Sequence, residues 1–283
     1  GTYELFRAHF AMPPLSAPDG RQIAAVRGLL RTLLSLLRQD DVSHVAIAFD
    51  RVVTSFRNQL FGGYKMGKGT PEELAAQFGL AEQAAAALGL VVWPMVEFEA
   101  DDALATAAHW WQYEPSVEQV VICSPDKDLT QMVQGQKVVC LDRRRGIIYD
   151  QATVVEKFGV LPESIPDYLG LVGDVADGIP GIPKWGSKTA GLVLSRYLHI
   201  ESIPANAKDW DVQVRGATGV ADSLAGRLND ALFYRQLTTL RLDVVLDESI
   251  DDLRWRGVDR NKFNQFCASL GISEKIQPHE WQT

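Results

Sequence analysis

Eight carboxylates stand at positions in this sequence where they could share a divalent cation site. Six of them follow three short apolar runs, and two more lie three positions apart further along the chain: Asp50, Glu99, Asp101, Asp102, Asp126, Asp128, Asp174 and Asp177. In an open α/β sheet, ligands bind outside the carboxyl ends of the strands, so the six strand-end acids are expected at one edge. Residues three apart lie on one side of a helical turn, which keeps the last pair together.

So many carboxylates in one cleft raise each other's pKa, and they can all stay ionised only if cations neutralise them. Oxygen ligands without His or Cys select magnesium or manganese rather than zinc. Two such ions about 4 Å apart can activate a water and stabilise the leaving oxygen of a phosphodiester. A single acid after a strand is most simply a helix cap. The pairs at 101–102 and 126–128 together favour a metal-dependent phosphoryl-transfer site.

Alternating strands and helices must position these acids. Residues 21–38 carry apolar side chains at helical spacing, and residues 44–49 form a short apolar run that ends at Asp50. A second helix is expected to start with Thr70 as its N-cap and to run to about Leu88. Further strands are expected at residues 90–98, 119–123, 138–141 and 147–149, the last two as a hairpin. Such alternation indicates a mostly parallel sheet covered on both faces, and after about residue 155 helices take over.

Composition sets wide limits on function. With 283 residues the chain forms one large domain or two joined ones, and it has no apolar run of the roughly 20 residues that a membrane span needs. Its three cysteines are widely spaced, which fits a reducing cytosol and neither a disulfide framework nor a zinc site. A net charge of −8 by itself argues against a nucleic-acid partner. However, several acids belong to the expected cation site, and the basic residues gather elsewhere, so the net charge decides little.

A glycine-rich turn follows the last pair of acids. Residues 173–190 read GDVADGIPGIPKWGSKTA, in which Gly178, Gly181 and Gly186 permit tight turns and close backbone approach. Residues 187–190 then open a helix whose free N–H groups can face a phosphate. The order of residues is not that of a Walker A loop. A plain loop between helices is the alternative, but the prolines and the paired acids favour a hairpin that grips duplex backbone without reading sequence.

Taken together, these motifs resemble the 5′-nuclease family, which includes flap endonucleases and the 5′-nuclease domain of bacterial DNA polymerase I. The resemblance covers essentially the whole chain, through GTYELFRAHF, FDRVVTSFRNQLFGGYKMGK, FEADD, SPDKD, the glycine-rich turn and the tail from LTTLRLDVVLDESIDDLRW. It implies a PIN-like (Rossmann-like) α/β core over residues 1–155, with a mostly parallel sheet flanked by helices and a helical arch at about 54–80. It also implies a C-terminal helical region over 156–283, with a helix–three-turn–helix at about 170–195.

The resemblance further implies a structure-specific, divalent-metal-dependent 5′-nuclease that acts at DNA 5′ flaps and 5′ ends in replication and repair. Such an enzyme would be a monomer in a bacterial-type cytoplasm, with branched or 5′-ended DNA as its partner. The first Mg²⁺ or Mn²⁺ ion would lie around Asp50, Glu99 and Asp101, with Asp102 as a further candidate. The second would lie around Asp126, Asp128, Asp174 and Asp177, partly through water. A potassium ion would be held at the helix–three-turn–helix.

The resemblance also assigns roles to basic residues. Arg7, Arg57 and Lys65 would contact and neutralise the attacked phosphate. Tyr64 could stack on a splayed nucleotide, and Lys68 would face the threaded 5′ strand. Contacts to the duplex backbone are expected from Lys184, Gly186, Ser187, Lys188 and Thr189.

Four departures from the family pattern bear on these expectations. The family's N-terminal Asp would stand immediately before Gly1, and we expect a short strand carrying it to precede this sequence. Asp177-Gly178 replaces the usual Asp-Asn, and Lys68 replaces an Arg, which keeps the charge but loses the bidentate fork. Lys184-Trp185 replaces the usual Gly-Ile in the hairpin, which weakens the case for potassium. Two alternatives stay open: a catalytically impaired module that binds DNA junctions, and an RNA-directed PIN-like nuclease, against which the hairpin speaks.

Overall fold

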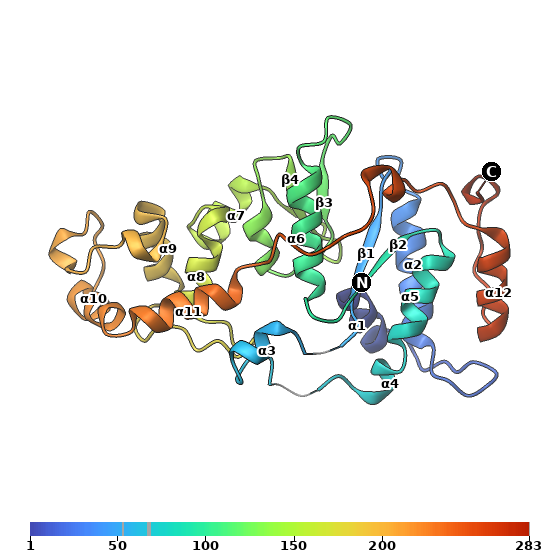
Figure 1. The fold of residues 1–283 in the computed structure, drawn as a ribbon, viewed down its shortest axis with the longest axis horizontal. Helices are drawn as coiled ribbons and strands as arrows, with labels where there is room; N and C mark the ends of the chain where they lie inside the picture. Colours follow the sequence, from blue (N-terminus) through green and yellow to red (C-terminus); the bar gives the residue numbers. More distant parts are fainter. Residues whose placement is uncertain (53, 67–68, 283) are drawn as a thin grey trace. The chain divides into compact units, whose positions relative to one another are not determined.

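The computed structural model describes residues 1–52, 54–66 and 69–282 (Figure 1). The chain divides into two compact units. The first consists of Gly1–Ser55, Lys68–Ala103 and Val244–Thr283, and the second of Phe56–Gly67 and Leu104–Asp243. Both units contain segments that are distant in sequence, and the predicted division at residue 155 stays a prediction.

The first unit contains two parallel strands and the helices that pack on them. Strand β1 (Ala46–Asp50) pairs with β2 (Val91–Met95), in the register that places Asp50 opposite Met95. The helices are α1 (Thr2–Ala11), α2 (Ala24–Leu37), α4 (Glu72–Ala75), α5 (Phe78–Ala87) and α12 (Arg260–Leu270), with 3-10 turns at Ile250–Leu253 and Pro278–Glu280. Helix α6 (Ala100–Trp111) begins in this unit and crosses the boundary. Leu30 of α2 is fully buried in its core, as the helical spacing of residues 21–38 predicted, and so are Leu29 of α2 and Phe49 of β1.

The prediction of one helix from Thr70 to Leu88 is wrong. The segment forms α4 and α5, and Pro71 rather than Thr70 is the N-cap of α4. The break falls at Gln77, which is 1% exposed. Its side-chain oxygen accepts hydrogen bonds from the N–H groups of Ala25 and Val26, at 3.1 and 3.3 Å. These N–H groups lie in the first turn of α2 and have no acceptor within their own helix. The Gln77 side chain caps them, and this role favours the break between α4 and α5 at Gln77.

The second unit contains a three-stranded sheet and most of the helices. Strand β3 (Val120–Ile122) pairs in parallel with β4 (Val138–Asp142), which pairs antiparallel with β5 (Ile147–Tyr149), so the predicted hairpin is confirmed. The helices are α3 (Phe56–Leu60), α7 (Gln151–Phe158), α8 (Ile165–Val172), α9 (Ser187–Tyr197), α10 (Ala217–Ala225) and α11 (Leu228–Thr238). Short 3-10 turns lie at Asp128–Met132, Pro162–Ser164, Ile200–Ser202 and Ala207–Asp209. Among the described residues, the strands therefore form two sheets rather than the single one expected.

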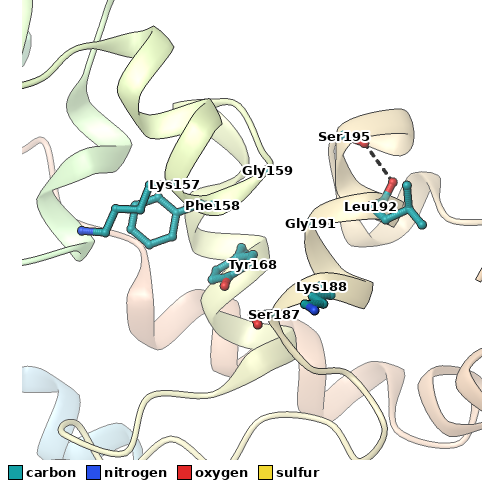
Figure 2. Close-up of a pocket in the computed structure, with 9 residues that line it drawn as sticks. All are labelled: Lys157, Phe158, Gly159, Tyr168, Ser187, Lys188, Gly191, Leu192 and Ser195. Atoms are coloured by element: carbon teal, nitrogen blue, oxygen red, sulfur yellow. Dashed lines mark hydrogen bonds between the residues drawn. The ribbon is translucent and has the colours of Figure 1, made fainter.

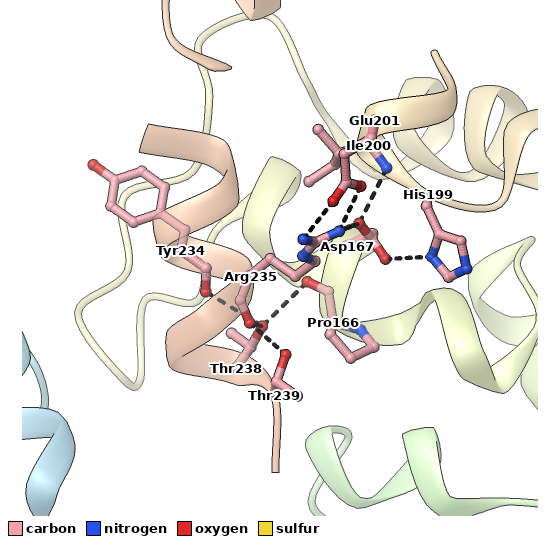
Figure 3. Close-up of polar contacts among 9 residues, drawn as sticks. All are labelled: Pro166, Asp167, His199, Ile200, Glu201, Tyr234, Arg235, Thr238 and Thr239. Atoms are coloured by element: carbon pink, nitrogen blue, oxygen red, sulfur yellow. Dashed lines mark hydrogen bonds and ion pairs between the residues drawn. The ribbon is translucent and has the colours of Figure 1, made fainter. Parts of the chain in front are cut away.

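A buried carboxylate links α8, the helix that precedes Asp174 and Asp177, to α11. Asp167 of α8 is 2% exposed and accepts hydrogen bonds from Arg235 Nη1 of α11 at 3.0 Å and from the Ile200 N–H at 3.1 Å (Figure 3). His199 Nδ1 lies 3.0 Å from the same carboxylate, and Arg235 also forms an ion pair with Glu201. The close packing of α8 on α11 fixes the helix that leads into Asp174.

No helix in the part of the chain that the structure describes is both long enough and apolar enough to cross a membrane.

Candidate metal centre

Three of the eight acids come together in the second unit. Asp128 begins the 3-10 turn after β3, and Asp174 and Asp177 lie in the turn after α8. That turn is closed by two backbone hydrogen bonds between Asp174 and Ile179, of 2.8 and 2.7 Å. One carboxylate oxygen from each of the three acids lies within 4.8 Å of the others. The predicted meeting of the acid after β3 with the paired acids of the glycine-rich turn is therefore found.

Asp128 has the surroundings that suit a cation best. It is 7% exposed, and its buried Oδ1 atom has no hydrogen-bond partner in the part of the chain that the structure describes. Burial raises the pKa of this carboxyl well above its ordinary value, and the nearby charges of Asp126, Asp177 and Asp174 raise it further. A buried oxygen without a donor is costly. A hard divalent cation, which prefers carboxylate oxygens, fits this arrangement of donors.

Lys127, which the sequence analysis did not single out, contacts the same acids. Its ammonium group forms an ion pair with Asp174. Burial acts to lower the pKa of Lys127, but the hydrogen bond to Asp174 and the charges of Asp128, Asp174 and Asp126 outweigh it and raise that pKa. Asp126 itself is exposed, and its Oδ1 accepts the Asp128 N–H at 3.0 Å. Its position between two of the eight acids was the signal that could have identified this lysine.

The acids of the first unit accept hydrogen bonds from backbone N–H groups and a hydroxyl. Asp50 Oδ1 at the end of β1 accepts the Ala100 N–H at 2.7 Å, and Asp102 Oδ2 accepts the Glu99 N–H at 3.0 Å. Glu99 is 8% exposed and accepts the Ser55 hydroxyl at 3.1 Å. Asp101 is half-buried in the first turn of α6. These acids cluster where β1 meets the start of α6, and a metal role for them stays a prediction, as does convergence of all eight acids at one edge.

Arg57 does not face solvent as a phosphate-contacting residue would. It is 1% exposed, and its guanidinium donates to the carbonyl oxygens of Leu237 at 2.8 Å and Thr239 at 3.1 Å. It also lies over the Phe56 ring, 4.6 Å from the centroid. The carbonyls at the end of a helix have no intrahelical donors, which explains why this buried arginine is held at the end of α11.

Tyr64 and Lys65 lie against the third acid of the cluster. Tyr64 is 2% exposed, packs with Ile179 and Leu237, and donates its hydroxyl to Asp177 Oδ2 at 3.3 Å. With the ring buried in this way, no face is open for a nucleotide to stack on. Lys65 Nζ lies 3.9 Å from Asp177 Oδ1. Lys68, expected to face the threaded strand, lies outside the described residues.

Arg7 lies in α1, where it is half-buried. Its guanidinium forms a 2.6 Å ion pair with Glu4 and donates to the Thr32 hydroxyl at 3.1 Å. The hydrogen bond to Thr32 links α1 to α2, and a phosphate contact from Arg7 stays a prediction.

The glycine-rich turn ends in the expected helix. Gly186 is the N-cap of α9, and Ser187 and Lys188 are exposed in its first turn, while Thr189 is half-buried. Lys184 is exposed and has φ +72°, a left-handed backbone conformation that is costly for a residue other than glycine. Trp185 is 3% exposed and donates its indole N–H to the Val220 carbonyl at 3.2 Å, so the Trp that departs from the family pattern is a core residue.

A cavity of about 420 Å³ lies beside the start of α9 (Figure 2). Lys157 of α7, Tyr168 of α8, and Ser187 and Lys188 of α9 line part of it. Burial raises the pKa of Tyr168, which the hydrogen bond from Ser187 opposes. Lys157 and Tyr168 were not predicted, because they lie outside the quoted motif and only the packing of α7 and α8 brings them beside it.

Comparisons with known proteins cover most of the chain. Residues 1–159 match the model of the 5′-3′ exonuclease, N-terminal resolvase-like domain, and residues 160–261 match that of the 5′-3′ exonuclease, C-terminal SAM fold. The chain is 31% identical to a 5′-3′ exonuclease of Aquifex aeolicus, over 98% of this chain and 92% of that protein. It is 38% identical to DNA polymerase I of Pseudomonas aeruginosa, over 89% of this chain and only 28% of that protein's length.

Solved structures agree on the fold. A flap endonuclease of bacteriophage T5, in complex with DNA and metal ions, superimposes with a TM-score of 0.60 at 17% sequence identity, over 87% of this chain and 89% of that one. The predicted PIN-like α/β fold with a C-terminal helical region is confirmed by this likeness and by the two domain models.

Proposed function

Because this chain belongs to the 5′-3′ exonuclease family, we propose that it hydrolyses DNA phosphodiesters at 5′ flaps and 5′ ends, as a structure-specific nuclease of replication and repair. Family membership confirms the nuclease class that the resemblance implied. The single observation that carries the rest of the proposal is the cluster of Asp128, Asp174 and the half-buried Asp177, in which one buried Asp128 oxygen has no donor among the described residues.

In the proposed mechanism, these three acids and Asp126 would hold one divalent ion, Mg²⁺ or Mn²⁺, partly through water. Asp50, Glu99 and Asp101, with Asp102 as a further candidate, would hold the other ion. When bound, such ions stabilise the charge that develops on the oxygens of a phosphodiester under attack. No His or Cys side chain belongs to the cluster of three, which suits hard cations and supports magnesium over zinc.

The basic residues neutralise and position the phosphate in this proposal. Lys65 approaches it from beside Asp177, Arg7 contacts it as well, and Lys68 faces the threaded 5′ strand. Arg57 acts indirectly, because its guanidinium is engaged with the end of α11. Tyr64 stacks on a nucleotide only if its buried cluster opens.

Duplex DNA is proposed to bind at the start of α9. The exposed Lys184, Gly186, Ser187 and Lys188, with Thr189 beside them, offer backbone N–H groups and ammonium charges to phosphates. The T5 relative is bound to DNA and metal ions, which supports the same partners here. We include in the proposal a potassium ion at this hairpin, a monomeric state, and a cytoplasmic location in a bacterium.

A 5′-flap DNA with a fluorophore on the flap tests the proposal. In Mg²⁺ the chain should release the labelled flap at the junction, and EDTA should stop the reaction. An RNA flap of the same shape should be cut more slowly. Absence of cleavage in both Mg²⁺ and Mn²⁺, with junction binding that survives EDTA, would instead identify a binding module without catalysis. A preference for the RNA flap would identify an RNA-directed nuclease.

A further inference from the structure

The segment of residues 56–66, called here the arch-base segment, packs onto the turn that carries Asp177. The Lys65 N–H donates to the Asp177 carbonyl at 3.0 Å. The Asn58 side chain donates to the Tyr64 carbonyl at 2.8 Å and so braces the bend between α3 and Lys65. At its other end, Arg57 is bonded to the carbonyls of Leu237 and Thr239. The segment is thus held to the second unit along its whole length.

Within this segment, Tyr64 has two separable contacts. Its ring is buried in a cluster with Ile179 and Leu237, against which Phe61 packs, and this apolar packing anchors the segment. Its hydroxyl contacts Asp177 Oδ2 at 3.3 Å, while Lys65 Nζ lies 3.9 Å from Oδ1 of the same carboxylate. Both oxygens of one proposed metal ligand are therefore oriented by the arch-base segment.

Gly178 is what allows the segment to approach so closely. Its φ is +73°, and a Cβ built on it would lie 2.3 Å from the Gly63 carbonyl oxygen. That neighbour is backbone, so it cannot rotate away as the end of a side chain could. A Cβ at position 178 therefore requires the turn or the arch-base segment to shift, so the family's usual Asn fits here only if the two lie farther apart.

We propose that the arch-base segment is a positioning element for the metal centre, in which the Tyr64 hydroxyl orients the Asp177 carboxylate and Gly178 provides the space for docking. Tyr64 is a positioning residue and not a metal ligand. Groups that hydrogen-bond to a metal ligand fix its direction, and losing one typically weakens metal binding by about 10- to 100-fold. The inference rests on the proposed function only in taking Asp177 as a metal ligand.

The first test is Tyr64→Phe, which removes the hydroxyl and keeps the packed ring. Mn²⁺ binding to the full chain without DNA is measured from the EPR signal of free Mn²⁺. We expect Mn²⁺ affinity to fall about tenfold, with the melting temperature in EDTA unchanged. Equal melting temperatures show that the variant folds, so the affinity change reports the hydroxyl alone.

The second test is Gly178→Asn, with Gly146→Asn as its matched control. Asn is among the residues that best tolerate positive φ. Gly146 has φ +67° and nothing within 4 Å of its added Cβ, so the control carries the same backbone strain without the clash. We expect trypsin to cut after Arg57 and Lys65 faster in Gly178→Asn only, and Mn²⁺ affinity to fall in that variant only.

Three results would overturn the inference. The first is an Mn²⁺ affinity of Tyr64→Phe within twofold of wild type. The second is faster proteolysis of Gly178→Asn with unchanged affinity, and the third is a trypsin pattern identical to that of Gly146→Asn. In each case a wild-type chain that still binds Mn²⁺ and cuts flaps leaves the proposed function standing. A wild-type chain that binds no Mn²⁺ overturns both proposals.

Discussion

The two groups of carboxylates differ in what compensates their charge. In the first unit, Asp50 and Asp102 accept backbone N–H groups at the start of α6, so helix donors satisfy them. In the second unit, Asp128 has a buried oxygen without a donor, and the ammonium of Lys127 pairs with Asp174. Backbone donors therefore satisfy the carboxylates of one group, whereas among the described residues one buried oxygen of the other group has no donor. We therefore expect a cation to increase the free energy of unfolding most when it binds the group that contains Asp128.

The largest expected effect is on catalysis. Asp174→Asn removes one negative charge from the cluster of Asp128, Asp174 and Asp177. We expect the rate of cleavage of the 5′-flap substrate in Mg²⁺ to fall roughly 10³-fold, as when one electrostatic contact is lost in other active sites. Flap binding in EDTA, followed by fluorescence anisotropy, should be unchanged or slightly tighter because one negative charge is gone. Cleavage within a few-fold of wild type would remove this group from the active site.

Metal binding should stabilise the folded chain through the second group. At 100 times its Kd, Mg²⁺ should add about 2.7 kcal/mol to the free energy of unfolding, as for any ligand bound only to the native state. Thermal unfolding with Mg²⁺ and with EDTA measures the difference. Asp128→Asn should lose most of this gain. If the gain persisted in that variant, the first group would be the main site of binding.

Without metal, Asp128→Asn should be more stable than the wild type. The folded-state pKa of Asp128 is raised above its ordinary value, so the folded chain binds that proton more tightly than the unfolded chain. Stability is therefore lost as pH rises from the ordinary pKa through the raised one, and the loss persists at neutral pH. We expect the melting temperature in EDTA at pH 7 to rise by a few degrees, the shift that about 1 kcal/mol produces in a domain of this size. At a pH below both pKa values the two proteins should melt together.

The smallest effect is expected from an Asp→Asn substitution among the acids of the first unit. Asp50→Asn keeps an oxygen that can accept the Ala100 N–H but loses the negative charge at the start of α6. We expect the free energy of unfolding in EDTA to fall by about 0.5 kcal/mol, from the lost interaction with the helix dipole. Chemical denaturation of Asp50→Asn and Asp128→Asn side by side gives the comparison its sharpest form. Shifts of the same sign would mean that the two groups do not differ as described.

Local patterns in the sequence determined much of this protein. Apolar runs predicted β1 to β5, and the acids after them predicted a cation site of which Asp128, Asp174 and Asp177 are found together. Glycines and prolines predicted the turn before α9. Each of these features depends on neighbours within a few residues, because strand and helix periodicity and turn chemistry are local properties.

The tertiary structure alone decided which polar side chains are buried and what satisfies them. Gln77 caps a helix 52 positions earlier and so divides one predicted helix into two. Arg57 bonds to a carbonyl 180 positions later, although its place in the motif indicated a phosphate contact. Whether a carboxylate meets an N–H group, an ammonium or nothing depends on segments that only folding brings together. For that reason the sequence identifies the eight acids, but it does not show which of them accept backbone N–H groups and which has a buried oxygen without a donor among the described residues.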